Sequence, residues 1–314
     1  MAATTLRGAS VPGRGGLDVG GTKIAGGLVR FPAGEVVARR QVPTGASRDA
    51  EDVLADAVGM ARDLAGGVPP GGHFAGVGLG VPELVDLDGR LASGGTIDWR
   101  GVPLGNRFAE VGPVWVEADV RAGAAAEARF GAGRTYRLFA YVTVGTGISH
   151  TLVQDGRPYA GARGNALVLA SGPTSVRCPG CGTWARLVLE AVAAGPALVA
   201  AHNAGRPDPV GRTEDVLAAA AQGDPGAAQV VRDAAEALGS GIGWLVNVLD
   251  PEAVVVGGGL GLAGGLYWDA FTDSVRRHVW ADATRDLPIV RAELGADAGL
   301  IGAAVHARDR AAGR

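Results

Sequence analysis

One short segment carries the groups that bind the phosphates of a nucleotide. Residues 18–23 (Asp-Val-Gly-Gly-Thr-Lys) offer bare glycine N–H groups, a hydroxyl, a cation and a carboxylate suited to magnesium or its waters. This is not a Walker loop, because there Gly-Lys-Ser/Thr opens a helix, whereas Ile24-Ala25 continues a strand here. The alternative is a plain hairpin with a glycine turn. The residues expected to contact a polyphosphate are Asp18, Gly20, Gly21, Thr22 and Lys23, with Asp18 toward the magnesium ion.

Two further glycine clusters fit the same chemistry. Residues 142–147 (Val-Thr-Val-Gly-Thr-Gly) resemble residues 17–22, which indicates an internal duplication in which each lobe presents one glycine turn to a shared central cleft. Residues 257–259 are three glycines between an apolar strand and a helix, a corner that can form a floor for a nucleotide. The added nucleotide contacts are expected at Thr146, Gly147, Gly257, Gly258 and Gly259.

The triple glycine also admits other interpretations. The letters from Gly259 to Gly264 match the dinucleotide-binding fingerprint. Only one more strand and helix follow before Arg314, too little for the rest of a dinucleotide domain. Plain turn chemistry is the remaining alternative.

The elements that must position these segments read as an α/β chain in two lobes. The length of 314 residues exceeds one average domain, and short apolar runs alternate with segments of helical periodicity. We expect a flexible tail over 1–13, an N-terminal lobe over 14–133 and a C-terminal lobe over 134–314, with the last helix a candidate to pack on the first lobe. Strands are expected near 15–30, 35–42, 74–81, 113–117, 137–155, 253–257 and 287–293, and helices over 49–64 and from Asp224-Pro225 to Asp250.

Composition excludes several classes of function. The net charge is −3 with 29 Lys and Arg spread thinly, so no basic field exists to hold a nucleic acid. Apolar stretches are interrupted well before the length that spans a membrane. Two cysteines form no disulfide framework and no leader precedes the first strand, which predicts a cytoplasmic protein.

Taken together, the motifs resemble the ROK (repressor, open reading frame, kinase) family of bacterial sugar kinases over about residues 16–306. The resemblance rests on the two glycine hairpins, the adenosine motif 254–259 and three intervening segments. These are residues 78–82 (Gly-Leu-Gly-Val-Pro), 98–104 (Asp-Trp-Arg-Gly-Val-Pro-Leu) and 116–127, from Val-Glu-Ala-Asp to Ala-Ala-Ala-Glu. The resemblance implies an actin/hexokinase-like (ribonuclease H-like) fold, ATP and Mg²⁺ as cofactors, and a homodimer. It also implies that Asp119 is the catalytic base that orients the acceptor hydroxyl, the alternative being a helix N-cap with no catalytic role.

Departures from the family pattern cluster in sugar recognition. Ala118 stands where the family has Asn, and in the stretch 164–171 Val168 and Ser171 replace a glutamate and a histidine that contact sugar hydroxyls. Asn165, in the same stretch, is expected to contact the substrate. His150 stands where the family has small residues, and either approaches the substrate or is structural.

The family zinc motif is also reduced. Cys178 and Cys181 remain, but Val188 falls where a third cysteine would be, and two ligands do not make a structural zinc site. Zinc is therefore not expected. Glu190 keeps a substrate-hydroxyl contact if two residues are inserted, whereas an ungapped alignment puts Val188 at that position.

An ordinary hexose would leave hydroxyls unpaired against Val168 and Ser171. We therefore predict an ATP-dependent kinase that phosphorylates a primary hydroxyl of a modified ring, an aminosugar such as kanosamine or a C7 cyclitol of the valiolone type, in an antibiotic or other secondary pathway. The alternatives are an ordinary glucokinase-like hexose kinase and a non-catalytic sugar-binding or regulatory protein. Repressors of the family carry an N-terminal helix-turn-helix, for which the residues before the first strand are too few.

Overall fold

The computed structural model describes residues 13–45, 48–68 and 72–313. The expected tail therefore lies outside the described residues, except for Gly13, which begins the first strand. The chain forms two compact units. The first comprises Met1–Phe130, Ala160–Asn165 and Asp297–Arg314, and the second comprises Gly131–Tyr159 and Ala166–Ala296. The chain thus divides a few residues before the expected boundary, and the assignment of Ala160–Asn165 to the first unit was not foreseen from the sequence.

The first unit is built on a five-stranded sheet in the order β3-β2-β1-β4-β5. β1 and β2 form the first glycine hairpin, β1 and β4 pair in parallel, and so do β4 and β5. The strands are β1 (Gly13–Val19), β2 (Lys23–Arg30), β3 (Glu35–Pro43), β4 (Phe74–Val81) and β5 (Val114–Ala118). The helices are α1 (Ala50–Gly66), α2 (Leu104–Arg107), α3 (Asp119–Phe130) and α10 (Ala298–Ala311).

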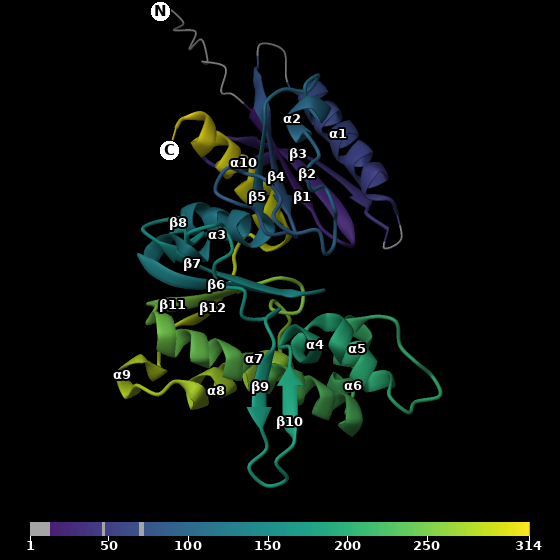
Figure 1. The fold of residues 1–314 in the computed structure, drawn as a ribbon, viewed down its shortest axis with the longest axis vertical. Helices are drawn as coiled ribbons and strands as arrows, with labels where there is room; N and C mark the ends of the chain where they lie inside the picture. Colours follow the sequence, from purple (N-terminus) through teal and green to yellow (C-terminus); the bar gives the residue numbers. More distant parts are fainter. Residues whose placement is uncertain (1–12, 46–47, 69–71, 314) are drawn as a thin grey trace, which may run out of the picture. The chain divides into compact units, whose positions relative to one another are not determined.

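The last helix, α10, packs directly on the backbone of this sheet and of α3 (Figure 1). Glycines make this approach possible: a Cβ on Gly16 would lie 1.9 Å from the carbonyl oxygen of Leu300, and a Cβ on Gly78 would lie 1.9 Å from that of Ala303. A Cβ on Gly302 would lie 1.8 Å from the carbonyl oxygen of Ala122 in α3. Since each contact is with backbone, no side-chain rearrangement could relieve it. The end of the chain is therefore fixed against the strands that carry the first glycine turn.

The second unit has its own five-stranded sheet, in the order β12-β11-β6-β7-β8. Its strands are β6 (Leu138–Val144), β7 (Ile148–Gln154), β8 (Arg157–Pro158), β11 (Ala253–Gly257) and β12 (Ile289–Arg291). Its helices are α4 (Glu190–Ala193), α5 (Gly195–Asn203), α6 (Thr213–Ala221), α7 (Pro225–Leu249), α8 (Leu266–His278) and α9 (Asp282–Arg285). Short 3-10 helices span Ala132–Thr135 and Gly295–Asp297, the second of which joins the two units.

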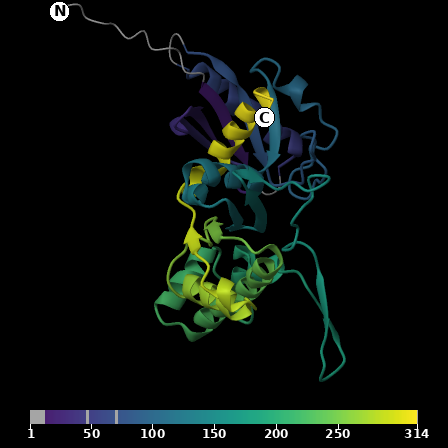
Figure 2. The same ribbon diagram turned by 90° about the vertical axis from the view of Figure 1, so that its left-hand side faces the viewer.

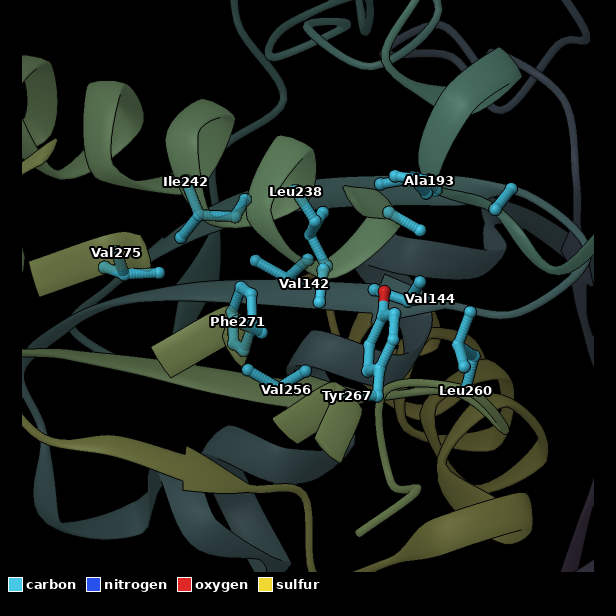
Figure 3. Packing of buried hydrophobic residues seen from close by; sticks show 14 of the residues in the cluster. Val142, Val144, Ala193, Leu238, Ile242, Val256, Leu260, Tyr267, Phe271 and Val275 are labelled. Atoms are coloured by element: carbon cyan, nitrogen blue, oxygen red, sulfur yellow. The ribbon is translucent and has the colours of Figure 1, made fainter. Parts of the chain in front are cut away.

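A core of aliphatic and aromatic side chains fills the space between this sheet and α7 and α8. Figure 3 shows Leu238 and Ile242 of α7 and Phe271 of α8 packed around Val142 and Val256 of the sheet. The expected start of α7 is confirmed, because the carboxylate of Asp224 accepts hydrogen bonds from the N–H groups of residues 226 and 227, at 2.8 and 3.0 Å.

A hairpin of β9 (Thr174–Arg177) and β10 (Trp184–Leu187) extends from the second unit (Figure 2). All residues of both strands are exposed to solvent. None of the helices in the described parts of the chain combines the length and apolarity needed to cross a membrane.

Candidate active site

Asp18 lies near the end of β1, in contact with the first turn of α10. A Cβ on Gly299, in the first turn of α10, would lie 2.4 Å from the Asp18 carboxylate oxygen Oδ2, so any larger residue at position 299 would displace that carboxylate. Burial raises the pKa of Asp18 to about 6, and the nearby cation of Lys23 only partly opposes the shift. Asp18 is thus a carboxylate held in a place where its charge is poorly solvated.

Asp119 is the first residue of α3, directly after β5. The parallel pairing of Ala118 with Val81 in β4 fixes where the strand ends and the helix begins. Burial is the main cause that raises the pKa of Asp119, and the negative charges of Asp18 and Glu83 act in the same direction, whereas the N–H of Val120, which donates to Oδ1 at 2.6 Å, lowers it. The net result is a pKa of about 7. The structure therefore brings Asp18 and Asp119 together electrostatically within the first unit.

This pair of acids suits a magnesium nucleotide. Two neighbouring carboxylates that resist ionisation gain from a nearby cation, which favours their charged forms. The described residues hold no group of three or more His, Cys, Asp or Glu side chains that could bind a metal ion by themselves. Magnesium is commonly bound through one or two carboxylates together with substrate phosphates, so the donors present here fit that ion.

The first glycine turn is hydrogen-bonded to Thr44, the residue that follows β3. The N–H of Gly20 donates to the carbonyl of Lys23 at 2.9 Å, and the hydroxyl of buried Thr44 donates to the carbonyl of Gly20 at 2.6 Å. The N–H of Thr44 donates to the carbonyl of Thr22 at 3.0 Å. Thr22, at the tip, is exposed. The turn is therefore held by hydrogen bonds at its base, while Thr22 is exposed to solvent.

Glu83 is a functional candidate that the sequence analysis missed. It is 6% exposed, and its carboxylate accepts hydrogen bonds from the hydroxyl of Ser93 and from the N–H groups of Gly95 (2.9 Å), Thr96 (2.5 Å) and Ile97 (2.8 Å). Burial alone would raise its pKa, but these hydrogen bonds together hold the pKa below its usual value. A Cβ on Gly21 would lie 3.1 Å from the Thr96 side chain, so the loop that Glu83 organises borders the first glycine turn.

The sequence also did not predict a role for Arg121, which binds the backbone of the segment that carries Asn165. Its buried guanidinium donates to the Glu117 carboxylate (2.7 Å) and to the carbonyls of Gly164 (2.7 Å) and Val85 (2.7 Å). Asn165, the next residue after Gly164, is exposed and belongs to the first unit. Nothing local in the sequence relates residues 85, 121 and 164, because their contact depends on the fold.

In the second unit, Thr146 and Gly147 lie in the turn between β6 and β7, as expected for a hairpin. The N–H of Ile148, which follows the turn, donates to a carboxylate oxygen of Glu190 at 2.8 Å. A Cβ on Gly147 would lie 2.7 Å from the same oxygen of Glu190. Glu190 was expected to read a substrate hydroxyl, but here one of its oxygens supports the backbone of the second glycine turn.

The triple glycine borders that turn within the same unit. Gly258 has φ +82°, and a Cβ there would lie 2.4 Å from the carbonyl oxygen of Val144, at the end of β6. That carbonyl also accepts from the N–H groups of Leu260 (3.0 Å) and Gly261 (3.1 Å). Only glycine fits this corner, and the corner joins Gly257–Gly259 to the base of the Gly145–Gly147 turn.

His150 does not lie at the tip of the hairpin. It is buried within β7, paired with Val142, and its ring nitrogens have no hydrogen-bond partner among the described residues. Burial lowers its pKa to about 4, so it is neutral near pH 7. This favours the structural alternative for His150.

The two cysteines lie in the exposed hairpin of the second unit. Cys178 and Cys181 are both exposed, and the Sγ of Cys181 lies 3.4 Å from the hydroxyl of Thr183. The expectation that this loop binds no zinc stays a prediction.

The sequence is similar to those of known proteins over nearly its whole length. The model of the ROK family matches residues 14–310. The glucokinase of Streptomyces coelicolor is 33% identical over 94% of this chain and 97% of its own length. The kanosamine kinase of Amycolatopsis mediterranei is 32% identical over 95% of this chain and 97% of its own length.

Among solved structures, a ROK family glucokinase from Streptomyces griseus in complex with glucose and AMPPNP superposes with a TM-score of 0.79, at 31% identity. The match covers 95% of this chain and 99% of that one. The expected actin/hexokinase-like α/β fold is confirmed.

Proposed function

This chain belongs to the ROK family and is a sugar kinase with an alcohol group as acceptor, and from that premise we propose that its acceptor is the exocyclic primary hydroxyl of a modified ring. The ring is an aminosugar such as kanosamine or a C7 cyclitol of the valiolone type, and the phosphate donor is ATP. The enzyme acts as a cytoplasmic homodimer in an antibiotic or other secondary pathway.

The observation that carries the kinase mechanism is the pair Asp18 and Asp119. The acceptor oxygen attacks the γ-phosphorus, the bond from that phosphorus to the bridging oxygen of ADP breaks, and the hydroxyl proton passes to Asp119. The raised pKa of Asp119, about 7, matches a group that must take up a proton near neutral pH. Magnesium bound with ATP supplies charge neutralisation on the phosphate oxygens, and Asp18 is the residue proposed to hold it.

The remaining nucleotide contacts are assigned to backbone-rich turns. In the first unit these are Gly20, Gly21, Thr22 and Lys23, and in the second they are Thr146, Gly147 and Gly257–Gly259. Each turn is fixed by contacts described above, so its N–H groups are positioned before the nucleotide binds. Such preorganised donors stabilise the charge that spreads over the transferred phosphoryl oxygens.

The observation that carries the choice of substrate is the stretch from Gly164 to Ser171. Val168, 41% exposed, and Ser171, also exposed, offer neither a carboxylate nor an imidazole to a sugar hydroxyl. Each hydroxyl left unpaired costs about 1 to 3 kcal/mol. A ring that carries an amine or lacks a ring oxygen presents different groups at that end, and the similarity to a kanosamine kinase supports this class.

An ordinary glucokinase is the second candidate, because glucokinases are equally similar over the same length. The experiment is a coupled ADP-release assay of the full chain with Mg-ATP and kanosamine, valiolone, glucose or N-acetylmannosamine. We expect kcat/KM for kanosamine or valiolone to exceed that for glucose by at least about tenfold. A higher kcat/KM for glucose would refute the modified-ring proposal and leave the kinase assignment in place.

A further inference from the structure

A cavity of about 490 Å³ lies entirely within the first unit, at the edge of its sheet formed by β5. Its lining comes from β5, from α10, from α2 and from the loop residues 88–91 and 99–103, and neither Asp18 nor Asp119 lines it. The volume falls in the range of pockets that hold small organic molecules. Nothing in the phosphoryl transfer described above uses this cavity.

Part of the lining is apolar. It includes Trp115, Leu91 and Val102. The guanidinium of Arg14 stacks on the Trp115 ring, with its Cζ 5.5 Å from the ring centroid, and itself donates to the carbonyl of Ala75 at 2.6 Å. A ring held in this way offers a fixed flat surface to a planar ligand.

Of the charged side chains that line the cavity, one arginine has no ion-pair partner among the described residues. Arg90 and Asp88 form an ion pair at 3.1 Å, so their charges cancel. Arg310, near the end of α10, is exposed and makes no ion pair with any of the described residues. A guanidinium that lines a partly apolar cavity and has no carboxylate partner favours a ligand with a single negative charge.

A hydrogen-bonding group completes the lining. His306 of α10 has its Nδ1 3.4 Å from the Glu117 carboxylate, which also binds the buried Arg121. Burial lowers the pKa of His306, so the ring contributes a neutral polar edge rather than a second cation. The wall therefore combines one ring surface, one cation and one neutral polar group.

From these contacts we propose that the cavity binds a small monocarboxylate with a planar apolar body. The body lies against Trp115 and Leu91, and the carboxylate is held by Arg310, with His306 beside it. This site is separate from that of phosphoryl transfer, and the proposal does not depend on the identity of the sugar.

The test is calorimetric titration of the full chain with 1-naphthaleneacetate and with its neutral counterpart of the same shape, 1-naphthaleneacetamide. Saturating Mg²⁺ and a non-hydrolysable ATP analogue are present to occupy the nucleotide site. We expect the anion to bind at least about tenfold more tightly than the amide, because a hydrogen bond to a charged group is the main difference between them. Equal affinities, or no binding of the anion up to about 5 mM, would overturn the proposal.

Two matched pairs of variants locate the site. Arg310→Ala should weaken binding of the anion about fivefold or more, whereas Arg285→Ala, which removes an exposed arginine of the second unit, should not. Gly105 lines the cavity and a Cβ there would meet nothing within 4 Å, so Gly105→Leu should block the mouth without strain.

Gly66→Leu is the control for the second pair, since a Cβ on Gly66 also meets nothing within 4 Å and Gly66 does not line the cavity. Undiminished binding of the anion in Gly105→Leu, or equal losses in Arg310→Ala and Arg285→Ala, would contradict the assignment.

Discussion

The acidic pair of the first unit and the stretch from residue 166 to 190 in the second unit differ in how tightly they are packed. In the first unit α10 packs so closely that glycine is required at positions 16, 78 and 302, where a Cβ would meet backbone, and at position 299, where a Cβ would meet the Asp18 carboxylate. From Ser171 to Leu187 almost every residue is exposed. A substitution in the first region therefore disturbs several helices and strands at once. A substitution in the exposed part of the second region alters only its own contacts. The comparison explains how the chain can keep the groups of phosphoryl transfer while departing from the family at the groups that read the sugar.

Gly299→Ala is expected to have the largest effect on the closely packed region around Asp18. The new methyl group would push the Asp18 carboxylate, and a displacement of about 1 Å at such a site can cost about 100-fold in kcat. The fall in kcat should come with a weaker dependence on magnesium, which a general loss of stability would not produce. Gly59→Ala in α1 is the control, because a Cβ there meets nothing within 4 Å. Unchanged kcat in Gly299→Ala would show that Gly299 does not position Asp18.

The pH dependence of kcat/KM tests the electrostatic coupling of the pair. Asp119 must be ionised to accept a proton, so kcat/KM should fall about tenfold per pH unit below an apparent pKa near 7. The apparent pKa of this acid limb reflects the coupled ionisation of Asp18 and Asp119, not that of either residue alone. Asp18→Asn removes one of the charges that raise the pKa of Asp119, so the residual activity of that variant should show its acid limb at lower pH. A limb that does not move would mean that the two carboxylates are not coupled.

The role of the exposed region is tested by placing the family's glutamate and histidine at positions 168 and 171. The double variant Val168→Glu with Ser171→His should lower the KM for glucose by about tenfold, because each added group can pair one hydroxyl. Both positions are exposed, so the variant should fold as the wild type does. A steady-state assay with glucose and kanosamine measures the effect. No gain for glucose would mean that these positions do not set the substrate.

Stability should show the smallest effect, with a defined sign. Folding raises the pKa of Asp119 from 3.8 to about 7, so the folded state binds the proton more tightly and loses stability as the pH rises through this range. Asp119→Asn should therefore be more stable than the wild type at pH 8 by about 1 to 3 kcal/mol, and no more stable at pH 4. Urea unfolding at both values of pH measures this.

The control for stability is Asp224→Asn, at the N-cap of α7. The ion pair with Arg206 and the hydrogen bonds to the helix N–H groups lower the pKa of Asp224, so this variant should lose stability at pH 8. Two aspartates changed in the same way should thus shift stability in opposite directions. A loss of stability in Asp119→Asn at pH 8 would contradict the cause assigned to its pKa.

Local patterns in the sequence predicted the glycine hairpins, α1, α7 and the position of Asp119 after an apolar strand, because each depends on neighbouring residues. The roles of Glu83, Arg121 and Gly299 could not be predicted. Asp18 meets Gly299 only because the last helix returns to the first strand, and Arg121 meets Gly164 only because that segment belongs to the first unit. The hydrogen bond from Ile148 to Glu190 likewise joins residues whose spacing carries no local signal.

The central claim is that Asp119 accepts the proton of the acceptor hydroxyl. Its most direct test is the rate of phosphate transfer from Mg-ATP to the best substrate by the Asp119→Asn protein, which keeps the shape of the side chain but cannot act as a base. We predict a fall in kcat of about 1,000-fold or more with little change in the Kd for ATP. A kcat within a few-fold of the wild type would contradict it.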